Sequence, residues 1–308
     1  MLMVPAAATV AATPAGAALC GDGPLDILLT NDDGYRSAGI RALRAQLLAA
    51  GHRVVLAAPD HNASGSAMSF TWSPVQVTVD PDAPEAYGVG GTPATAVVLA
   101  ATALYPAGRR PDLVISGINH GPNAGALLVL SGTVGAALAG TLLLDPPVPG
   151  MAVNAERLVP GEAPDSAANR AQFDAVATHA TRLLGAVRGW YCDDGRVALG
   201  RTVLNVNYPA RATQELRGTV LAPQATSPDL RVAFVADPDG RYRAETARDA
   251  AAAESGSDRD YLARGYVTVT PVGGAIGDAN VPRRALERRL RDLRPAVRPA
   301  STPAPAGG

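Results

Sequence analysis

The feature that most constrains this chain is a series of short apolar segments, each of which ends in polar or turn-forming residues. The segments are residues 25–30, 54–58, 112–117, 150–155 and 202–209. Buried strands of parallel sheets read as short, continuous apolar runs of this kind. After the first segment, apolar residues recur at helical spacing from Ile40 to Leu48, and Gly51 is expected to end that helix. Strands that alternate with helices predict an α/β protein with a parallel, doubly wound sheet covered on both faces.

The region between residues 216 and 266 departs from this pattern. Strand-like segments on either side of the turn Asp237–Gly240 predict a β-hairpin that projects from the main sheet. Residues 265–271 alternate as a returning strand should. We therefore divide the chain into an Ala-rich leader or disordered extension (1–24), a main domain (25–280) with a hairpin arm (about 216–255), an amphipathic C-terminal helix (281–294) and a disordered Pro/Ala tail (295–308).

The composition excludes several classes of protein. Of the 308 residues, 47% are hydrophobic and 18% are charged, which allows a large buried core. A net charge of −1 argues against a protein that coats nucleic-acid duplexes, because such a protein needs an excess of cations. No apolar run reaches the ~18–20 residues needed to span a bilayer. Two cysteines are too few for a disulfide scaffold or a Cys-rich zinc site.

Residues 1–24 allow two interpretations. They are almost all small and apolar but lack the positively charged start of a complete signal peptide. They are either a secretory leader whose charged beginning lies upstream of Met1, or a disordered extension. Export is the favoured hypothesis and a cytoplasmic protein the alternative. In an oxidising compartment Cys20 and Cys192 can form a disulfide; otherwise Cys20 is removed with the leader and Cys192 is a lone thiol.

Polar residues gather at the ends of three of the predicted strands. Because ligands of open α/β sheets bind beyond the carboxyl ends of the strands, these segments are expected to share one rim. They are residues 31–34 after the first strand, 60–66 after the second and 116–123 at the end of the third.

Asp32 and Asp33 are adjacent acids on this rim. Neighbouring carboxylates repel each other unless a cation lies beside them, and carboxylate, hydroxyl and amide oxygens suit hard divalent ions such as Mg²⁺, Mn²⁺ or Ca²⁺. The alternative is that both residues cap the following helix, which explains one aspartate better than two.

A second feature of the rim is the start of a helix rich in Ala, Gly and Leu. Ser131 is a suitable N-cap, and the amides of Gly132 and Thr133 at the positive helix end form an anion site. The alternative is an ordinary capped core helix.

Several of these segments together resemble the SurE family of 5′/3′-nucleotidases, the survival-protein phosphatases. The matching segments are 31–40, 58–66, 91–99, 111–125 and 131–140, followed by 204–209 and 256–271. The likeness covers roughly residues 25–271 in the right order. It implies a Rossmann-like three-layer α/β/α sandwich with a β-hairpin arm, usually exchanged between the subunits of a homodimer or homotetramer.

The resemblance also implies hydrolysis of nucleoside monophosphates with one divalent metal ion per subunit, most simply Mg²⁺ or Mn²⁺, or Ca²⁺ in a crystal. The implied metal ligands are Asp32, Asp33, Ser64 and Asn119. The implied phosphate contacts are Asn123, Ser131 and Thr133, and the anion site adds Gly132.

From these residues we expect a metal-activated water as the nucleophile rather than direct attack by Asp32. We list Asp32, Asp33, Asn119 and His120 as catalytic, although His120 is alternatively a neutral loop residue, as is His61.

Three departures from the family pattern place the substrate pocket in question: Thr95 stands where an aspartate is common, residues 126–130 are apolar rather than acidic, and residues 272–280 lack a common acidic motif. The apolar segment motivates the alternative of a non-catalytic pseudoenzyme that binds nucleotide or metal. A dinucleotide-dependent oxidoreductase and a serine hydrolase are disfavoured, because neither a complete G-x-G-x-x-G nor a G-x-S-x-G motif is present.

Overall fold

The computed structural model describes residues 17–159, 162–193, 196–197, 201–227, 230–248 and 254–274. The expected C-terminal helix (281–294) and tail (295–308), and residues 1–16 of the expected leader, lie outside the described residues.

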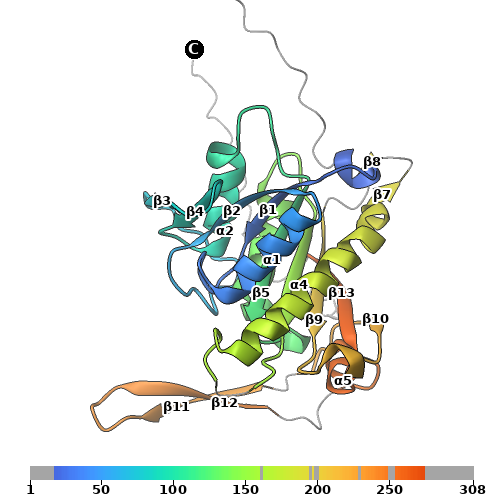
Figure 1. Ribbon diagram of the computed structural model, residues 1–308. Coiled ribbons are helices and arrows are strands. Elements are labelled where there is room, and N and C mark those ends of the chain that lie inside the picture. The colour runs from blue at the N-terminus through green and yellow to red at the C-terminus, as the bar shows by residue number, and fades with distance from the viewer. Residues whose placement is uncertain are drawn as a thin grey trace, which may run out of the picture. The chain divides into compact units, whose positions relative to one another are not determined.

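The centre of the fold is a nine-stranded, mostly parallel sheet (Figure 1). Its spatial order is β10 (Thr219–Leu221), β13 (Val267–Gly273), β9 (Thr202–Tyr208), β6 (Gly150–Ala155), β5 (Leu113–His120), β1 (Asp26–Thr30), β2 (Arg53–Pro59), β4 (Ala86–Val89) and β3 (Val77–Val79). The six strands from β9 to β4 are parallel, so the five strands predicted from apolar runs are confirmed. The edge strand β3 runs antiparallel to β4, and β13, which lies just inside the edge strand β10, runs antiparallel to β9; the parallel-sheet prediction did not include either.

Helices cover both faces of this sheet, which confirms the three-layer α/β/α architecture. The helices α1 (Ala38–Ala49) and α4 (Ala167–Val187) pack on one face, around buried residues such as Leu29, Leu43 and Phe173. The helices α2 (Pro93–Leu99) and α3 (Gly132–Leu143) pack on the other, around Leu28 and Ala136. Shorter elements are η1 (Ala17–Cys20), η2 (Ala100–Leu104), η3 (Gly125–Leu130), η4 (Arg188–Tyr191), η5 (Thr213–Glu215) and α5 (Asp258–Ala263). In the described part of the chain no helix is long and apolar enough to cross a membrane.

The order of the strands places a crevice beside β1. The chain passes from β1 outward through β2 to β4 and then returns to β5 on the other side of β1. At such a switch point the connections leave the sheet in opposite directions, and ligands bind at the carboxyl ends of the two strands. The carboxyl ends of β1 and β5 are therefore where a ligand site is expected.

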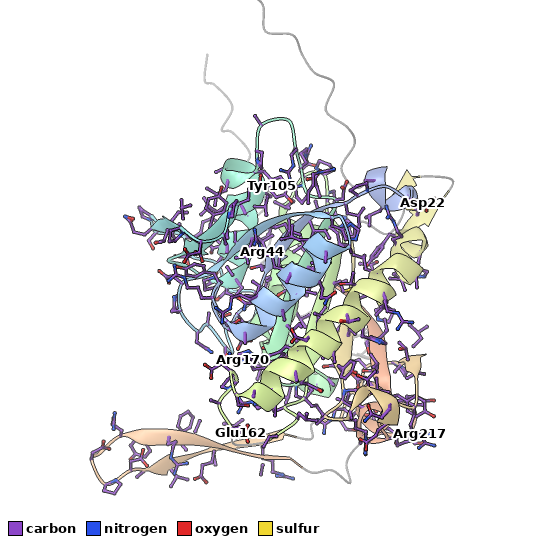
Figure 2. All side chains as sticks on the ribbon, in the orientation of Figure 1. Asp22, Arg44, Tyr105, Glu162, Arg170 and Arg217 are labelled. Atoms are coloured by element: carbon purple, nitrogen blue, oxygen red, sulfur yellow. A yellow bond between two sulfur atoms is a disulfide. The ribbon has the colours of Figure 1, made fainter. Side chains whose placement is uncertain are left out.

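The predicted hairpin is present but shorter than expected. Among the described strands, β11 (Leu230–Ala236) and β12 (Tyr242–Arg248) pair only with each other, around a turn at Asp237–Gly240. Figure 2 shows side chains on both sides of this ribbon, and the exposed fractions of Phe234 and Tyr242 are 69% and 70%. The expected arm began near residue 216, but β10 lies in the main sheet beside β13, so the arm begins after it.

Residues 17–25, just before β1, belong to the folded domain, whereas we expected a leader or disordered extension up to residue 24. Leu19 is fully buried in the same core as α1 and α4. Arg188 donates hydrogen bonds to the carbonyls of Ala18 and Gly23. The proposed disulfide between Cys20 and Cys192 is present, with 5.7 Å between the Cα atoms. Cys192 begins the short pair β7 (Cys192–Asp193) and β8 (Arg196–Val197).

Candidate functional site

The turn that follows β1 is held by Asn31. Its Nδ2 donates to the carbonyl of Gly34 (3.1 Å) and to Oγ of Ser37 (2.8 Å), and its Oδ1 accepts from the Gly34 amide (3.2 Å). Ser37 occupies the N-cap of α1. The alternative that Asp32 and Asp33 cap the following helix is therefore wrong.

The side chain of Asp32 instead contacts the start of α3, where its partner Thr133 lies 101 residues further along the chain. Oγ1 of Thr133 donates to its Oδ1 at 2.6 Å, and the main-chain amides of Gly132 and Thr133 also hydrogen bond to it. Burial raises the pKa of Asp32 above its ordinary value, although these hydrogen bonds oppose the shift. The helix end that we expected to bind phosphate thus already holds the carboxylate of Asp32, because an anion of the protein's own satisfies the same free amides.

Asp33 is next to Asp32 but faces β5. The main-chain amide of His120 donates to Oδ2 of Asp33 (3.2 Å), and Nδ1 of His120 lies 3.4 Å from Oδ1. Burial and the neighbouring charge of Asp32 raise the pKa of Asp33 to about 7.

Burial and the positive charge of Arg157 lower the pKa of His120 to about 4, and its ring stacks on Phe173 with 4.9 Å between centroids. His120 is therefore neutral at pH 7.

The end of β5 is irregular in a way that directs Asn119 to this rim. The register with β6 shifts between Gly117 and Asn119, and such bulges redirect side chains near functional sites. Nδ2 of Asn119 donates to the carbonyl of Gly121 at 2.8 Å, which leaves its Oδ1 available to a cation. Asn123 follows in the same loop, and its Nδ2 donates to Oδ1 of Asn154 (2.7 Å).

The loop after β2 supplies hydroxyl groups, but not in the way the sequence suggested. Ser64 is exposed, and its amide donates to Oδ1 of Asn62 (2.9 Å). The hydroxyl of Ser66 is buried without a hydrogen-bond partner. Both side chains lie close to Gly132: if this residue carried a Cβ atom, that atom would lie 2.6 Å from Oγ of Ser66 and 2.8 Å from Oδ2 of Asp32. Ser66, which we did not select, is thus the serine of this loop whose hydroxyl packs against Gly132, as the Asp32 carboxylate does.

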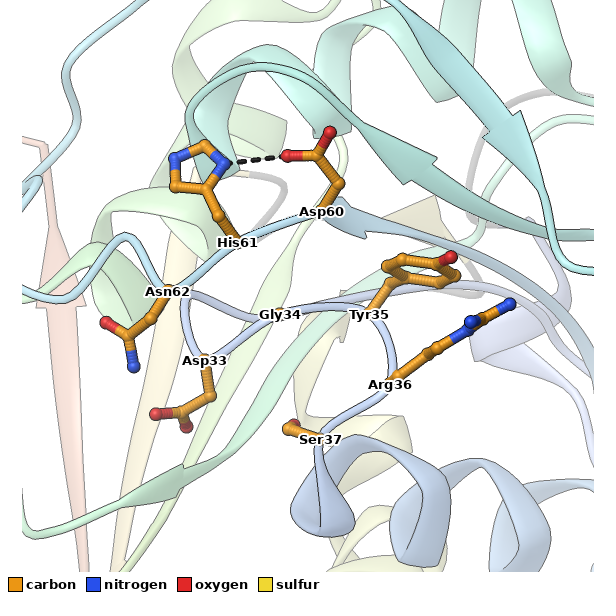
Figure 3. Close-up of a pocket in the computed structure, with 8 residues that line it drawn as sticks. All are labelled: Asp33, Gly34, Tyr35, Arg36, Ser37, Asp60, His61 and Asn62. Carbon is orange, nitrogen blue, oxygen red and sulfur yellow. Dashed lines mark hydrogen bonds and ion pairs between the residues drawn. The ribbon is translucent and has the colours of Figure 1, made fainter.

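A cavity of about 350 Å³ adjoins Asp33 (Figure 3). It lies between the turns that follow β1 and β2, and Asp33 forms part of its wall. In Figure 3 Asp33 and Asn62 point to one side of the turn, whereas Tyr35 and Arg36 point to the other. Nδ1 of His61 lies 2.7 Å from Oδ1 of Asp60 on the exposed rim, so His61 is engaged with a neighbour in its own loop.

The departures from the family pattern have structural explanations at two positions. Oγ1 of Thr95 accepts from the amide of Thr71 (2.8 Å) and contacts the hydroxyl of Thr92, so Thr95 joins a loop to the start of α2. The apolar segment 126–130 forms most of η3, where Leu128 is buried, while Val129 and Leu130 are exposed beside the start of α3.

Arg157 is a further residue of the rim that the sequence analysis missed. β6 ends at Ala155, which pairs in register with His120, and Arg157 follows two residues later with an exposed side chain. Its charge opposes the rise in the pKa of Asp33 and contributes to the fall in that of His120. The available signal was a cation just beyond the carboxyl end of a predicted central strand.

The fold and this geometry define an α/β protein with a buried pair of acids at the switch point of a mostly parallel sheet. The model of the survival protein SurE family matches residues 27–228, and this chain belongs to that family.

Relatives and a solved structure agree with this assignment. The chain is 40% identical over 255 residues to the 5′-nucleotidase SurE of Desulfovibrio desulfuricans, which covers 80% of this chain and 92% of the relative. It is 38% identical over 260 residues to the 5′-nucleotidase SurE of Solidesulfovibrio magneticus, covering 82% and 93%. The crystal structure of the SurE protein from Aquifex aeolicus matches with a TM-score of 0.67 and 32% identity, covering 86% of this chain and 99% of that one.

Proposed function

We propose that this chain is a divalent-metal-dependent phosphomonoesterase that hydrolyses nucleoside 5′- or 3′-monophosphates to nucleoside and phosphate. The observation that carries the proposal is the buried pair Asp32 and Asp33, which no arginine contacts in the described part of the chain. Relatives that align over most of their length carry the name 5′-nucleotidase.

The donor set of the site suits a hard divalent cation. Asp32, Asp33 and Asn119 offer carboxylate and amide oxygens, and the loop after β2 offers the hydroxyl of Ser64. Ser66 is a second candidate for that hydroxyl, because its buried oxygen has no partner. When bound, Mg²⁺ or Mn²⁺ neutralises a phosphate dianion and lowers the pKa of a coordinated water.

The protein's own residues would orient the ester. Asn123 and Ser131 would bind the phosphoryl oxygens, while Gly132 and Thr133 would act indirectly by holding Asp32, to which both hydrogen bond. His120 is neutral, so its role is to fix Asp33 through its main-chain amide rather than to donate a proton from an imidazolium. Fixed donors of this kind act in the transition state without reorganisation.

A substrate-by-metal panel tests the proposal. Phosphate release is measured from AMP, GMP, 3′-nucleotides and p-nitrophenyl phosphate with Mg²⁺, Mn²⁺ or a chelator. Release from nucleotides that needs the metal is the expected result. No release with any metal would favour the non-catalytic binding protein instead. Comparing Ser64→Ala with Ser66→Ala then identifies the hydroxyl ligand, since only the ligand's loss raises the metal concentration needed for half-maximal activity.

We further propose that the chain forms a homodimer or homotetramer through the hairpin β11–β12 and that it is exported. Phe234 and Tyr242 are exposed on a ribbon that pairs with no other strand of the described chain, which supports the first proposal. The disulfide between Cys20 and Cys192 supports the second. Deleting residues 230–248 should lower the oligomeric mass in solution, and N-terminal sequencing of the mature protein tests export.

A further inference from the structure

The loop Gly121–Gly125 after β5 is held by side chains from other strands and from α5. Within it Asn123 is the residue we assign to phosphate, and its surroundings are unusually polar for the interior of a sheet. The side chains of Asn154 on β6 and of Asn205 and Asn207 on β9 are each fully buried.

Asn205 and Asn207 both hydrogen bond to the main chain of Asn123. Oδ1 of Asn207 accepts from the amide of Asn123 (2.8 Å). The carbonyl of Asn123 accepts from Nδ2 of Asn205 (2.7 Å) and from Nδ2 of Asn207 (3.2 Å). Both main-chain polar groups of this one loop residue are therefore satisfied by side chains of β9.

Asn154 connects this arrangement to the side chain of Asn123. Nδ2 of Asn154 donates to Oδ1 of Asn205 (2.8 Å), and its own Oδ1 accepts from Nδ2 of Asn123 (2.7 Å). One amide hydrogen of Asn123 is thereby fixed. Its second amide hydrogen and its Oδ1 remain for a ligand.

The far end of the loop is held separately. Oδ2 of the buried Asp258 accepts from the amide of Gly125 (2.9 Å), and its Oδ1 accepts from the amide of Ala225 (2.9 Å). Nε2 of Gln224 donates to the carbonyl of Gly125 (3.0 Å). The loop is thus fixed at its centre and at its end by groups that lie far away in the sequence.

Stability alone does not account for asparagines at these positions. Asparagine is depleted in strands, and buried amides gain little over well-packed apolar residues unless every polar group is satisfied. Asn205 and Asn207 are two residues apart, so they lie on the same face of β9, and both direct hydrogen bonds to the same loop residue.

We propose that Asn205 and Asn207 are positioning residues that fix the main chain of Asn123 and so hold its side chain ready for a phosphoryl group. The inference rests on the proposed function of the same site. Neither residue touches the reacting atoms; they act through Asn123.

The test compares Asn205→Ala and Asn207→Ala with the unaltered protein in the presence of Mn²⁺. Inorganic phosphate is the first probe, with its affinity measured by calorimetry, and AMP turnover is the second. The dissociation constant for phosphate and the KM for AMP should rise together by about tenfold, which corresponds to loss of about one hydrogen bond to a charged group. The value of kcat should fall less. Asn205→Ser and Asn207→Ser serve as milder variants if the alanine forms do not fold.

Gln172→Ala is the matched control. Nε2 of the buried Gln172 donates to the carbonyl of Pro209 (3.0 Å), just beyond β9, and not to the loop. Its loss should lower the melting temperature while the phosphate affinity stays the same. If the Asn205 and Asn207 variants behave as this control does, the positioning role is overturned. Failure of the unaltered protein to bind phosphate would also overturn it. Phosphate binding without AMP turnover would instead count against the proposed reaction alone.

Discussion

The two ends of β1 carry acidic residues in opposite circumstances. At the start of the strand, Asp26 accepts from Arg53 (2.6 and 3.1 Å) and from Arg109 (2.7 Å). Burial by itself would raise the pKa of Asp26, but the two arginines outweigh it and hold the pKa below its ordinary value. At the end of the strand, Asp32 and Asp33 are buried together, and the pKa of each is raised.

This difference separates a structural acid from a functional one. The fold pairs Asp26 with cations where only stability is at stake, yet it leaves two carboxylates without such partners at the switch point. An arrangement that costs stability persists in a fold when something outside the chain completes it. A divalent cation is the partner that the oxygen donors around Asp32 and Asp33 favour.

The strongest test of the comparison replaces one aspartate at each end of β1 by asparagine, in two separate variants. Asp33→Asn should lower kcat/KM for AMP by at least about 100-fold, because it removes a charged ligand from the reacting centre. Its melting temperature without metal should not fall, since the raised pKa shows that the charge is unfavourable there. Asp26→Asn should instead affect stability and not activity: the free energy of unfolding should fall by about 1–3 kcal/mol, while kcat/KM stays within twofold. Circular dichroism and phosphate release measure both; equal activity of the two variants would remove the distinction.

The disulfide extends the comparison, because it lies at the amino end of the sheet. The main chain of Ala18 hydrogen bonds to Asp112 just before β5, and Cys20 follows two residues later. The double variant Cys20→Ser with Cys192→Ser should lose about 2–4 kcal/mol, since the bridge closes a loop of 172 residues in the unfolded chain. Denaturant unfolding measures the loss. If kcat also falls at a temperature where the variant is folded, then the amino end of the sheet affects the acid pair at its carboxyl end, and the two ends are not independent.

The two ends should also respond oppositely to pH. The folded pKa of Asp33 is about 7, above its ordinary value of 3.8, so the metal-free folded state binds this proton more tightly than the unfolded chain. The contribution of Asp33 to stability is therefore present below about pH 4 and is lost as the pH rises to about 7. The contribution of Asp26 is instead lost as the pH falls through its lowered pKa.

Melting temperatures in a chelator between about pH 5 and pH 7.5 measure this dependence. The unaltered protein should lose several degrees relative to Asp33→Asn over this range. Mn²⁺ should abolish the difference, because a bound cation takes the place of the proton. A chelated protein whose pH profile matches that of Asp33→Asn would refute the raised pKa.

The sequence predicted what depends on single strands and their ends. Apolar runs identified the central strands, and polar residues after β1 and β5 marked the rim. Contacts between segments that are distant in the chain could not be predicted from the sequence. Nothing in the sequence indicated that Asp32 meets Thr133 across 101 residues, or that Asn205 meets Asn123 across 82. The exposed Ser64 and the buried Ser66 differ only through the conformation of their loop, which the spacing of residues does not determine.

The smallest expected effect concerns Arg157, the cation whose charge acts on Asp33 without an ion pair between them in the described part of the chain. An exposed arginine near a buried acid pair contributes little to stability, but it attracts a dianionic substrate to the rim. Arg157→Gln should raise the KM for AMP about threefold to tenfold with kcat nearly unchanged, and the effect should shrink as salt is added. Arg170→Gln is the matched control, because Arg170 is an exposed arginine of α4 whose Nη2 lies 3.7 Å from the Asp165 carboxylate. If both variants raise KM equally, general surface charge rather than the position of Arg157 is responsible. If Arg157→Gln alone raises KM, then the uncompensated end of β1 has a cation placed for the substrate, whereas the arginines at the other end are placed for the fold.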